Sequence, residues 1–144
     1  MRVVIAGEIP FVDEVARLCR QTAHDTSVVL VEDFLGALEA GYDADHLSQA
    51  EIVIELHNES AAAKQELLSE LSDFVPDDAL ILTSALATSA TQAASWVRRP
   101  ERVVGFGVLP PIGDGGLVEL ARALQTSEWA LVQAELFWRG LGQE

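Results

Sequence analysis

The chain has 144 residues, which fits one domain, and its 49% hydrophobic content with a mean hydropathy of +0.22 argues against intrinsic disorder. A formal net charge of −14 opposes attraction to nucleic-acid phosphates and to anionic membranes, so we expect neither as a partner. No apolar run approaches the roughly 20 residues that span a bilayer, and the opening MRVVIAG is too short for a signal-peptide core, so we expect a cytoplasmic protein.

Strand and helix signals alternate in the first half of the chain. Apolar, β-branched runs predict buried strands over 2–6, 27–32 and 51–56. After the first strand, an apolar face at helical spacing predicts a helix with Phe11, Val15, Leu18 and Cys19 on its buried side, and 34–41 is a weaker helical segment.

The second half continues the alternation. It predicts helices over 60–71, 88–97, 116–124 and 127–140, with strands over 79–83 and 102–108 between them. In the helix over 60–71 we place Lys64, Glu66 and Glu70 on the polar side. Alternating strands and helices with short links predict an α/β, Rossmann-like parallel sheet of about five or six strands, with helices on both faces. No linker divides the chain, so residues 1–144 are expected to form a single domain.

The turn after the first strand lacks the glycine pattern of dinucleotide-binding domains. That pattern, GxGxxG, lets the backbone bend sharply and approach the pyrophosphate closely. Here the turn reads AGEIPF, with Gly7 as its one glycine and Glu8 adding negative charge. At the end of the second strand, Glu32 stands where an acidic residue would bind the ribose, although an acid that simply faces solvent is the commoner explanation of such a residue.

From residue 50 onward the chain resembles the 3-hydroxyacyl-CoA (3-hydroxybutyryl-CoA) dehydrogenase family. The likeness lies in AEIVIELHNESAAAKQELLSEL, in RPERVVGFGVLPPI with the following LVELA, and in the closing TSEWALVQAELFWRGLG. Glu55, Glu59 and Lys64 match the first of these family segments. The resemblance implies a Rossmann NAD-binding domain of fatty acid metabolism in a shortened form, without the family's C-terminal helical domain.

The resemblance also implies that most catalytic residues are replaced. The family's general base, a histidine, would fall on Gly107, and the glutamate that orients it falls on Glu119. The family's catalytic serine would fall on Leu86 and its asparagine on Ser84. Glycine and leucine cannot accept the hydroxyl proton, and loss of a general base typically costs about 10² to 10⁴ in rate. Glu119 is thus the residual catalytic candidate. The residual cofactor-binding candidates are Glu32, Glu59, Lys64 and Ser84.

Histidine and cysteine offer little further chemistry in this sequence. His57 follows the third predicted strand and is a candidate substitute base, whereas His24 and His46 have polar contexts that predict exposure. No pair of histidines has a metal-ligand spacing such as HxxxH, so no metal is expected. The one cysteine, Cys19, is predicted to be buried in a helix. NAD binding is expected to be weak or absent.

The closing helix over 127–141 is apolar nearly all the way round, which indicates burial on more than one side. A homodimer contact or a separate helical-domain chain would cover it, and the alternative is cover by neighbouring helices of the same domain. A basic cluster of Arg98, Arg99 and Arg102 is expected to pair with local acids, with phosphate binding as the alternative.

Three functional hypotheses follow. The first is a reduced, catalytically impaired member of the family that acts as a binding or dimeric assembly module. The second is a working NAD-dependent 3-hydroxyacyl-CoA oxidoreductase that a partner chain completes. The third is an obligate dimer with a collapsed ligand site. All three share one fold, and a fold alone does not select among them.

Overall fold

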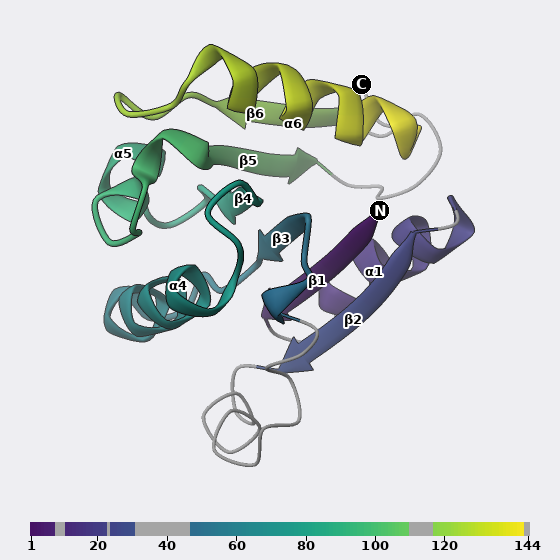
Figure 1. Cartoon of the computed structure of the whole chain (residues 1–144), viewed down its shortest axis with the longest axis horizontal. Helices are drawn as coiled ribbons and strands as arrows, with labels where there is room; N and C mark the ends of the chain where they lie inside the picture. The colour runs from purple at the N-terminus through teal and green to yellow at the C-terminus, as the bar shows by residue number, and fades with distance from the viewer. Residues whose placement is uncertain (8–10, 23, 31–46, 110–116, 143–144) are drawn as a thin grey trace.

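A six-stranded sheet forms the centre of the molecule, with strand order β2-β1-β3-β4-β5-β6 (Figure 1). The computed structural model describes residues 1–7, 11–22, 24–30, 47–109 and 117–142. The strands are β1 (Arg2–Gly7), β2 (Asp25–Leu30), β3 (Ile52–Glu55), β4 (Leu80–Ser84), β5 (Val103–Leu109) and β6 (Leu117–Ala121). Neighbouring strands from β2 to β5 pair in parallel, whereas β6 pairs antiparallel with β5.

Helices cover both faces of this sheet (Figure 1). They are α1 (Phe11–Gln21), α4 (Ala61–Phe74), α5 (Ala90–Ala94) and α6 (Glu128–Gly140), and a short 3-10 helix, η2 (Pro100–Arg102), precedes β5. Three of the helices begin at serine N-caps, whose hydroxyls accept hydrogen bonds from the backbone two or three residues into the helix: Ser60, Ser89 and Ser127.

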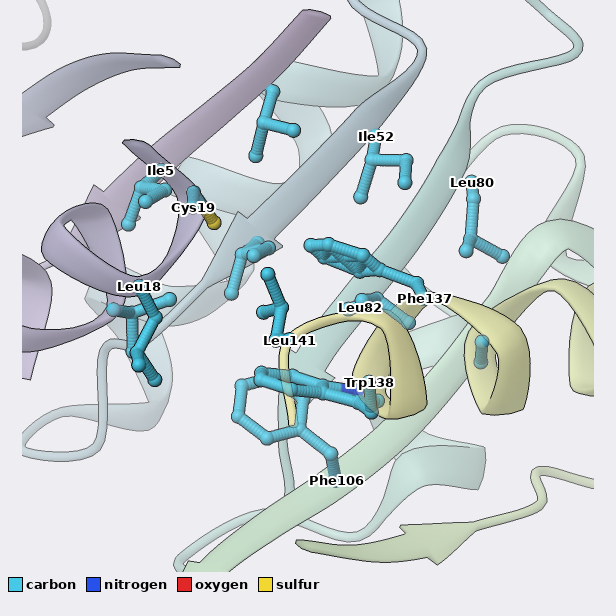
Figure 2. Packing of buried hydrophobic residues seen from close by; sticks show 14 of the residues in the cluster. Ile5, Leu18, Cys19, Ile52, Leu80, Leu82, Phe106, Phe137, Trp138 and Leu141 are labelled. Atoms are coloured by element: carbon cyan, nitrogen blue, oxygen red, sulfur yellow. The ribbon is translucent and has the colours of Figure 1, made fainter. Parts of the chain in front are cut away.

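Two separate hydrophobic clusters hold the layers together. On one face α1 and α6 pack on the sheet, and Figure 2 shows Phe137 and Trp138 of α6, with Leu141 directly after the helix, gathered over the strands. Phe106 of β5 packs against Trp138 with ring centroids 5.1 Å apart. On the other face α4 and α5 cover the alternate side chains of the same strands, including Val4, Val53 and Ile81. Strands buried on both faces explain why they read as continuous apolar runs in the sequence.

The predicted α/β fold is confirmed, with one element wrong. The segment predicted as a helix over 116–124 contains strand β6 instead. Its exposure alternates, with Leu117 and Glu119 facing solvent and Val118 and Leu120 partly buried against the core. This period of two is the pattern of a half-buried edge strand. Pairing with β5 gives the backbone N–H and C=O groups of β6 hydrogen-bond partners, whereas a helix this short would leave most of its own unpaired. The weak helical segment over 34–41 and the turn over 8–10 lie outside the described residues.

Other element boundaries shift slightly from the prediction. The helix predicted over 88–97 is limited to α5, and the helix predicted over 60–71 continues to Phe74. Within the described part of the chain, no helix is long and apolar enough to cross a membrane.

Cys19 is fully buried in α1, as predicted, and burial raises the pKa of its thiol to about 12, which leaves it protonated and unreactive.

Candidate functional site

The carboxyl ends of the parallel strands meet at one edge of the sheet, where ligands bind in folds of this kind. Register places Glu55 of β3 beside Thr83 of β4, and Thr83 beside Gly105 of β5. Polar side chains and glycines that are far apart in the sequence therefore gather along this edge. They form two corners with different properties, one around Glu55 and one around Gly107.

The first corner is a buried ion pair between Glu55 and Lys64. The Lys64 ammonium lies 2.6 Å from Glu55 Oε1, and the two residues are 1% and 0% exposed. Thr83 donates its hydroxyl proton to the same carboxylate oxygen at 2.6 Å, and the backbone N–H of His57 donates to the other at 2.5 Å. Lys64 also donates to the carbonyl oxygen of His57 at 2.8 Å. We call these four residues the Glu55 cluster.

The position of Lys64 corrects the sequence prediction, which placed it on the polar side of its helix. Leu67, Leu68 and Leu71 carry α4 onto the sheet, and Lys64 shares their side, one turn earlier. Its stem is therefore buried, and its ammonium reaches the only acidic side chain in the apolar strand β3. Burial raises the pKa of Glu55 above its ordinary value, while Lys64, Thr83 and the His57 backbone pull it back down.

His57, Asn58 and Ser84 line the edge next to the Glu55 cluster. His57 is 5% exposed, and its Nε2 accepts a hydrogen bond from the backbone N–H of Ser60 at 3.2 Å, so the ring is held against the start of α4. Ser84 donates to the amide oxygen of Asn58 at 2.9 Å and links the ends of β4 and β3. These contacts stiffen the loop between β3 and α4, and Ser84 directs its hydroxyl at Asn58.

The second corner joins three positions that the resemblance assigns to catalysis. Gly107 of β5 lies directly opposite Glu119 of β6 in the antiparallel ladder. Side chains at opposed positions project from the same face of the sheet, with Cβ atoms roughly 4.5–5.5 Å apart. A Cβ added at Gly107 would meet only Leu86 Cδ2, at 3.7 Å, which is ordinary contact. We call Leu86, Gly107 and Glu119 the catalytic-position corner.

The catalytic-position corner is open to solvent. Leu86 is 66% exposed, Glu119 is exposed, and Gly107 is partly exposed. A histidine at 107 would therefore have both room and a carboxylate neighbour. As the chain stands, Glu119 is the only one of the three with an ionisable group.

The remaining predicted site residues lie apart from both corners or outside the described chain. Glu59 is exposed just before α4, and Glu32 is outside the described residues. The sequence prediction missed Thr83 and Asn58. Thr83 could have been found, because a hydroxyl in the apolar run ALILT lies beside a strand that carries a buried acid. Asn58 offered no such signal.

Contacts within the fold account for two further residues of this edge. A Cβ added at Gly7 would lie 2.8 Å from Leu56 Cβ, so the packing of β1 on the chain after β3 is enough to require this glycine. Lys64 is paired with Glu55, so its ammonium could bind a ligand phosphate only by breaking that pair. Among the described residues no group of three or more metal-ligating side chains occurs.

The basic cluster lies away from this edge and is occupied by local partners. Arg98 and Arg99 each lie 3.2 Å from a carboxylate oxygen of Asp77. Arg102 is 2% exposed and donates to the carbonyl oxygens of Pro76 at 2.5 Å and Arg98 at 3.0 Å. Pairing with a local acid, as predicted, thus holds for Arg98 and Arg99, whereas Arg102 is a buried donor to backbone carbonyls.

Comparison with known proteins places this geometry in a family. The profile described as 3-hydroxyacyl-CoA dehydrogenase, NAD binding domain, matches residues 12–144. A 3-hydroxybutyryl-CoA dehydrogenase of Mycobacterium tuberculosis is 35% identical over 104 residues, which cover 72% of this chain and 36% of that protein. A probable 3-hydroxybutyryl-CoA dehydrogenase of Bacillus subtilis is 29% identical over 117 residues, covering 78% of this chain and 41% of that protein.

Solved structures agree with this placement at the level of fold. The crystal structure of an (S)-3-hydroxybutyryl-CoA dehydrogenase from Ralstonia eutropha superposes with a TM-score of 0.85 at 21% identity, covering 99% of this chain and 62% of that one. The crystal structure of M. tuberculosis FadB2 gives a TM-score of 0.83 at 24% identity, covering 99% of this chain and 61% of that one. The matched regions make up 36% and 41% of the two curated relatives, so the chain spans less than half of their length.

Proposed function

The chain belongs to the family of the 3-hydroxyacyl-CoA dehydrogenase NAD-binding domain, and from this premise we propose that it is a reduced, catalytically impaired homologue acting as a binding or dimeric assembly module. One observation carries the proposal. The three positions that the resemblance assigns to base, orienting acid and serine converge in the catalytic-position corner, and two of them, Gly107 and Leu86, have no group that can transfer a proton.

The chemistry of the family's reaction explains why this loss matters. Oxidation of a hydroxyacyl group sends a hydride to the nicotinamide and a proton to a base within hydrogen-bonding reach. When bound, NAD would supply the hydride acceptor, but it cannot supply the base. Glu119 would orient a histidine at 107 if one were present, and an exposed carboxylate alone leaves that step without its usual acceptor.

Cofactor affinity is proposed to be weak for an independent reason. Two of the candidate cofactor-binding side chains serve the fold instead, since Lys64 of α4 neutralises the buried carboxylate of β3 and Ser84 at the end of β4 donates to the amide oxygen of Asn58. The turn after β1 has a single glycine and carries Glu8, which opposes a diphosphate at the start of the following helix. NAD and acyl-CoA would then bind weakly or not at all.

A calorimetric titration with NAD, NADH and acetoacetyl-CoA, with an oxidoreductase assay on the same sample, tests this function. We expect neither micromolar binding nor turnover. Micromolar binding accompanied by turnover would contradict the proposal and favour the alternative, a working NAD-dependent 3-hydroxyacyl-CoA oxidoreductase completed by a partner chain. His57→Ala would then be the first variant to assay, because His57 is the histidine at this edge.

A further inference from the structure

Helix α6 carries a second apolar face that the rest of the described chain does not cover. Ala130, Ala134 and Phe137 pack on the sheet, whereas Trp129, Val132 and Leu136 are 49%, 49% and 58% exposed. The exposed three recur at intervals of three and four residues, so they form one stripe along the helix. We call Trp129, Val132 and Leu136 the α6 stripe. Exposed apolar groups clustered in this way mark association surfaces.

Charged residues do not interrupt the stripe. Glu128, Glu135 and Arg139 follow one another at intervals of seven and four, so they share a different side of α6, where Arg139 and Glu135 pair at 2.7 Å. The helix therefore has one side on the sheet, one charged side and one exposed apolar side. An apolar seam with charges along its flank is the arrangement by which helices pair with one another.

An open hollow of about 490 Å³ runs beside the α6 stripe. Its floor includes Met1, Ile52 and Leu80 at the starts of the strands, so it lies at the amino edge of the sheet, opposite the site described above. Trp129, Leu136 and Gly140 of α6 line it too. A Cβ added at Gly140 would meet nothing within 4 Å, so the helix has open space at that position.

A second copy of this chain matches these features by symmetry. If two α6 helices pack antiparallel with Trp129 of one copy opposite Gly140 of the other, the largest side chain of each stripe faces the open space on its partner. The same register places Gln133 opposite Leu136, and two-fold symmetry repeats both contacts. The α6 stripe and the hollow that Trp129 and Leu136 help to line then face the same surface of the other copy.

Charge on the helix flank supports the same register. Antiparallel pairing brings Glu128, which pairs with Arg122 at 2.5 Å, to within two residues, or about 3 Å along the axis, of Arg139 in the Glu135–Arg139 pair of the other copy, so the two ion pairs can join into one network. Antiparallel helix dipoles add a favourable term. The net charge of −14 on each copy opposes association, and because salt screens it, association should strengthen as ionic strength rises.

We propose that the α6 stripe and its adjoining hollow form the interface of a two-fold homodimer, in which Trp129 of each copy packs over Gly140 of the other. The homodimer specifies the assembly role proposed above and rests on that part of the proposed function. It does not depend on ligand binding, so the test uses the protein without NAD or acyl-CoA, and its failure leaves the proposal of catalytic impairment untouched.

Sedimentation velocity over a concentration series tests the dimer. Wild-type protein is expected to reach twice the 15.5 kDa mass of one chain, at lower concentration in high salt than in low salt. Gly140→Leu fills the open space and is expected to weaken association at least about tenfold. Because leucine favours the helix more than glycine does, this variant should melt no lower than wild type at a protein concentration where both are monomeric, which separates interface loss from misfolding.

A size exchange tests the register. Trp129→Ala combined with Gly140→Leu moves the larger side chain to the other side of the contact and is expected to recover association relative to Gly140→Leu alone. Leu86→Glu is the matched control, because it replaces an exposed leucine at the opposite edge of the sheet and should associate like wild type. Monomer at every concentration and salt level, or a Gly140→Leu variant that associates like wild type, would overturn the homodimer.

Discussion

The two corners of the carboxyl edge differ in what their polar residues do. In the Glu55 cluster, the Glu55 carboxylate, the Lys64 ammonium and the Thr83 hydroxyl are buried, and their hydrogen bonds run within the fold. In the catalytic-position corner, Leu86 and Glu119 are exposed and Gly107 is partly exposed, and Glu119 alone of the three carries an ionisable group. Residues that match a family segment, such as Glu55 and Lys64, can thus hold the fold together, and under the proposed function the neighbouring corner is the frame of a site without its chemistry.

The largest expected effect comes from breaking the Glu55 cluster. Lys64→Met leaves Glu55 buried without its counter-ion, and removal of one partner of a buried pair typically costs about 3–5 kcal/mol. Urea unfolding at pH 7.5 measures the loss. The double variant Glu55→Gln with Lys64→Met is the control and should be markedly more stable than Lys64→Met, since no charge is left unpaired. Equal stability of the two variants would contradict the account, because it would mean that a buried Glu55 without its counter-ion carries no penalty.

The same variant should show a diagnostic pH dependence. Burial already raises the pKa of Glu55, and loss of Lys64 removes the largest effect that lowers it. The folded state then holds the carboxyl proton more tightly than the unfolded state, so stability is greatest below the unfolded pKa and falls as pH rises. Lys64→Met is therefore expected to recover stability between pH 7.5 and pH 5, a recovery absent from the double variant.

Two glycines on β5 provide a smaller, matched comparison. A Cβ at Gly105 would lie 2.7 Å from the Ala90 Cβ, whereas at Gly107 it meets only Leu86 Cδ2 at 3.7 Å. Gly105→Ala is expected to cost about 1–3 kcal/mol through overpacking against α5. Gly107→Ala should be neutral or stabilising by roughly 0.4–1 kcal/mol, because it restricts the unfolded chain. Thermal unfolding of both variants measures the difference, and a Gly107→Ala variant as unstable as Gly105→Ala would contradict an open corner.

The smallest expected effect is electrostatic. In Gly107→His the new imidazole would lie opposite Glu119, and the carboxylate should raise the pKa of that histidine above its ordinary value of about 6.5. NMR titration measures it, with Gly107→His combined with Glu119→Gln as the control, in which the pKa should return toward 6.5. If the two variants titrate alike, Glu119 does not face position 107.

The fold could be predicted from the sequence because strands buried on both faces leave continuous apolar runs that alternate with amphipathic helices. The short segment LVELA was predicted wrongly, since five residues carry too little periodicity to separate an edge strand from a helical turn. Its pairing with β5 joins residues that are 8 to 16 positions apart, which local patterns do not record.

The site was predictable only where the family resemblance reached it. Gly107 and Glu119 were paired by that resemblance, and the ladder confirms that they are neighbours. The Glu55–Lys64 pair was missed because a lysine on an amphipathic helix is usually solvated. A signal was available: an acid within the buried strand EIVIEL requires a counter-charge, and Lys64 begins the helix that follows it.

The most direct test of a retained frame with lost chemistry is the initial rate of NADH oxidation with acetoacetyl-CoA, measured for wild type beside Glu119→Gln. We predict a wild-type rate no greater than that of a protein-free control, and no change in Glu119→Gln. A wild-type rate clearly above the control that falls by about 10² or more in Glu119→Gln would contradict the prediction, because the catalytic-position corner would then still perform the reaction.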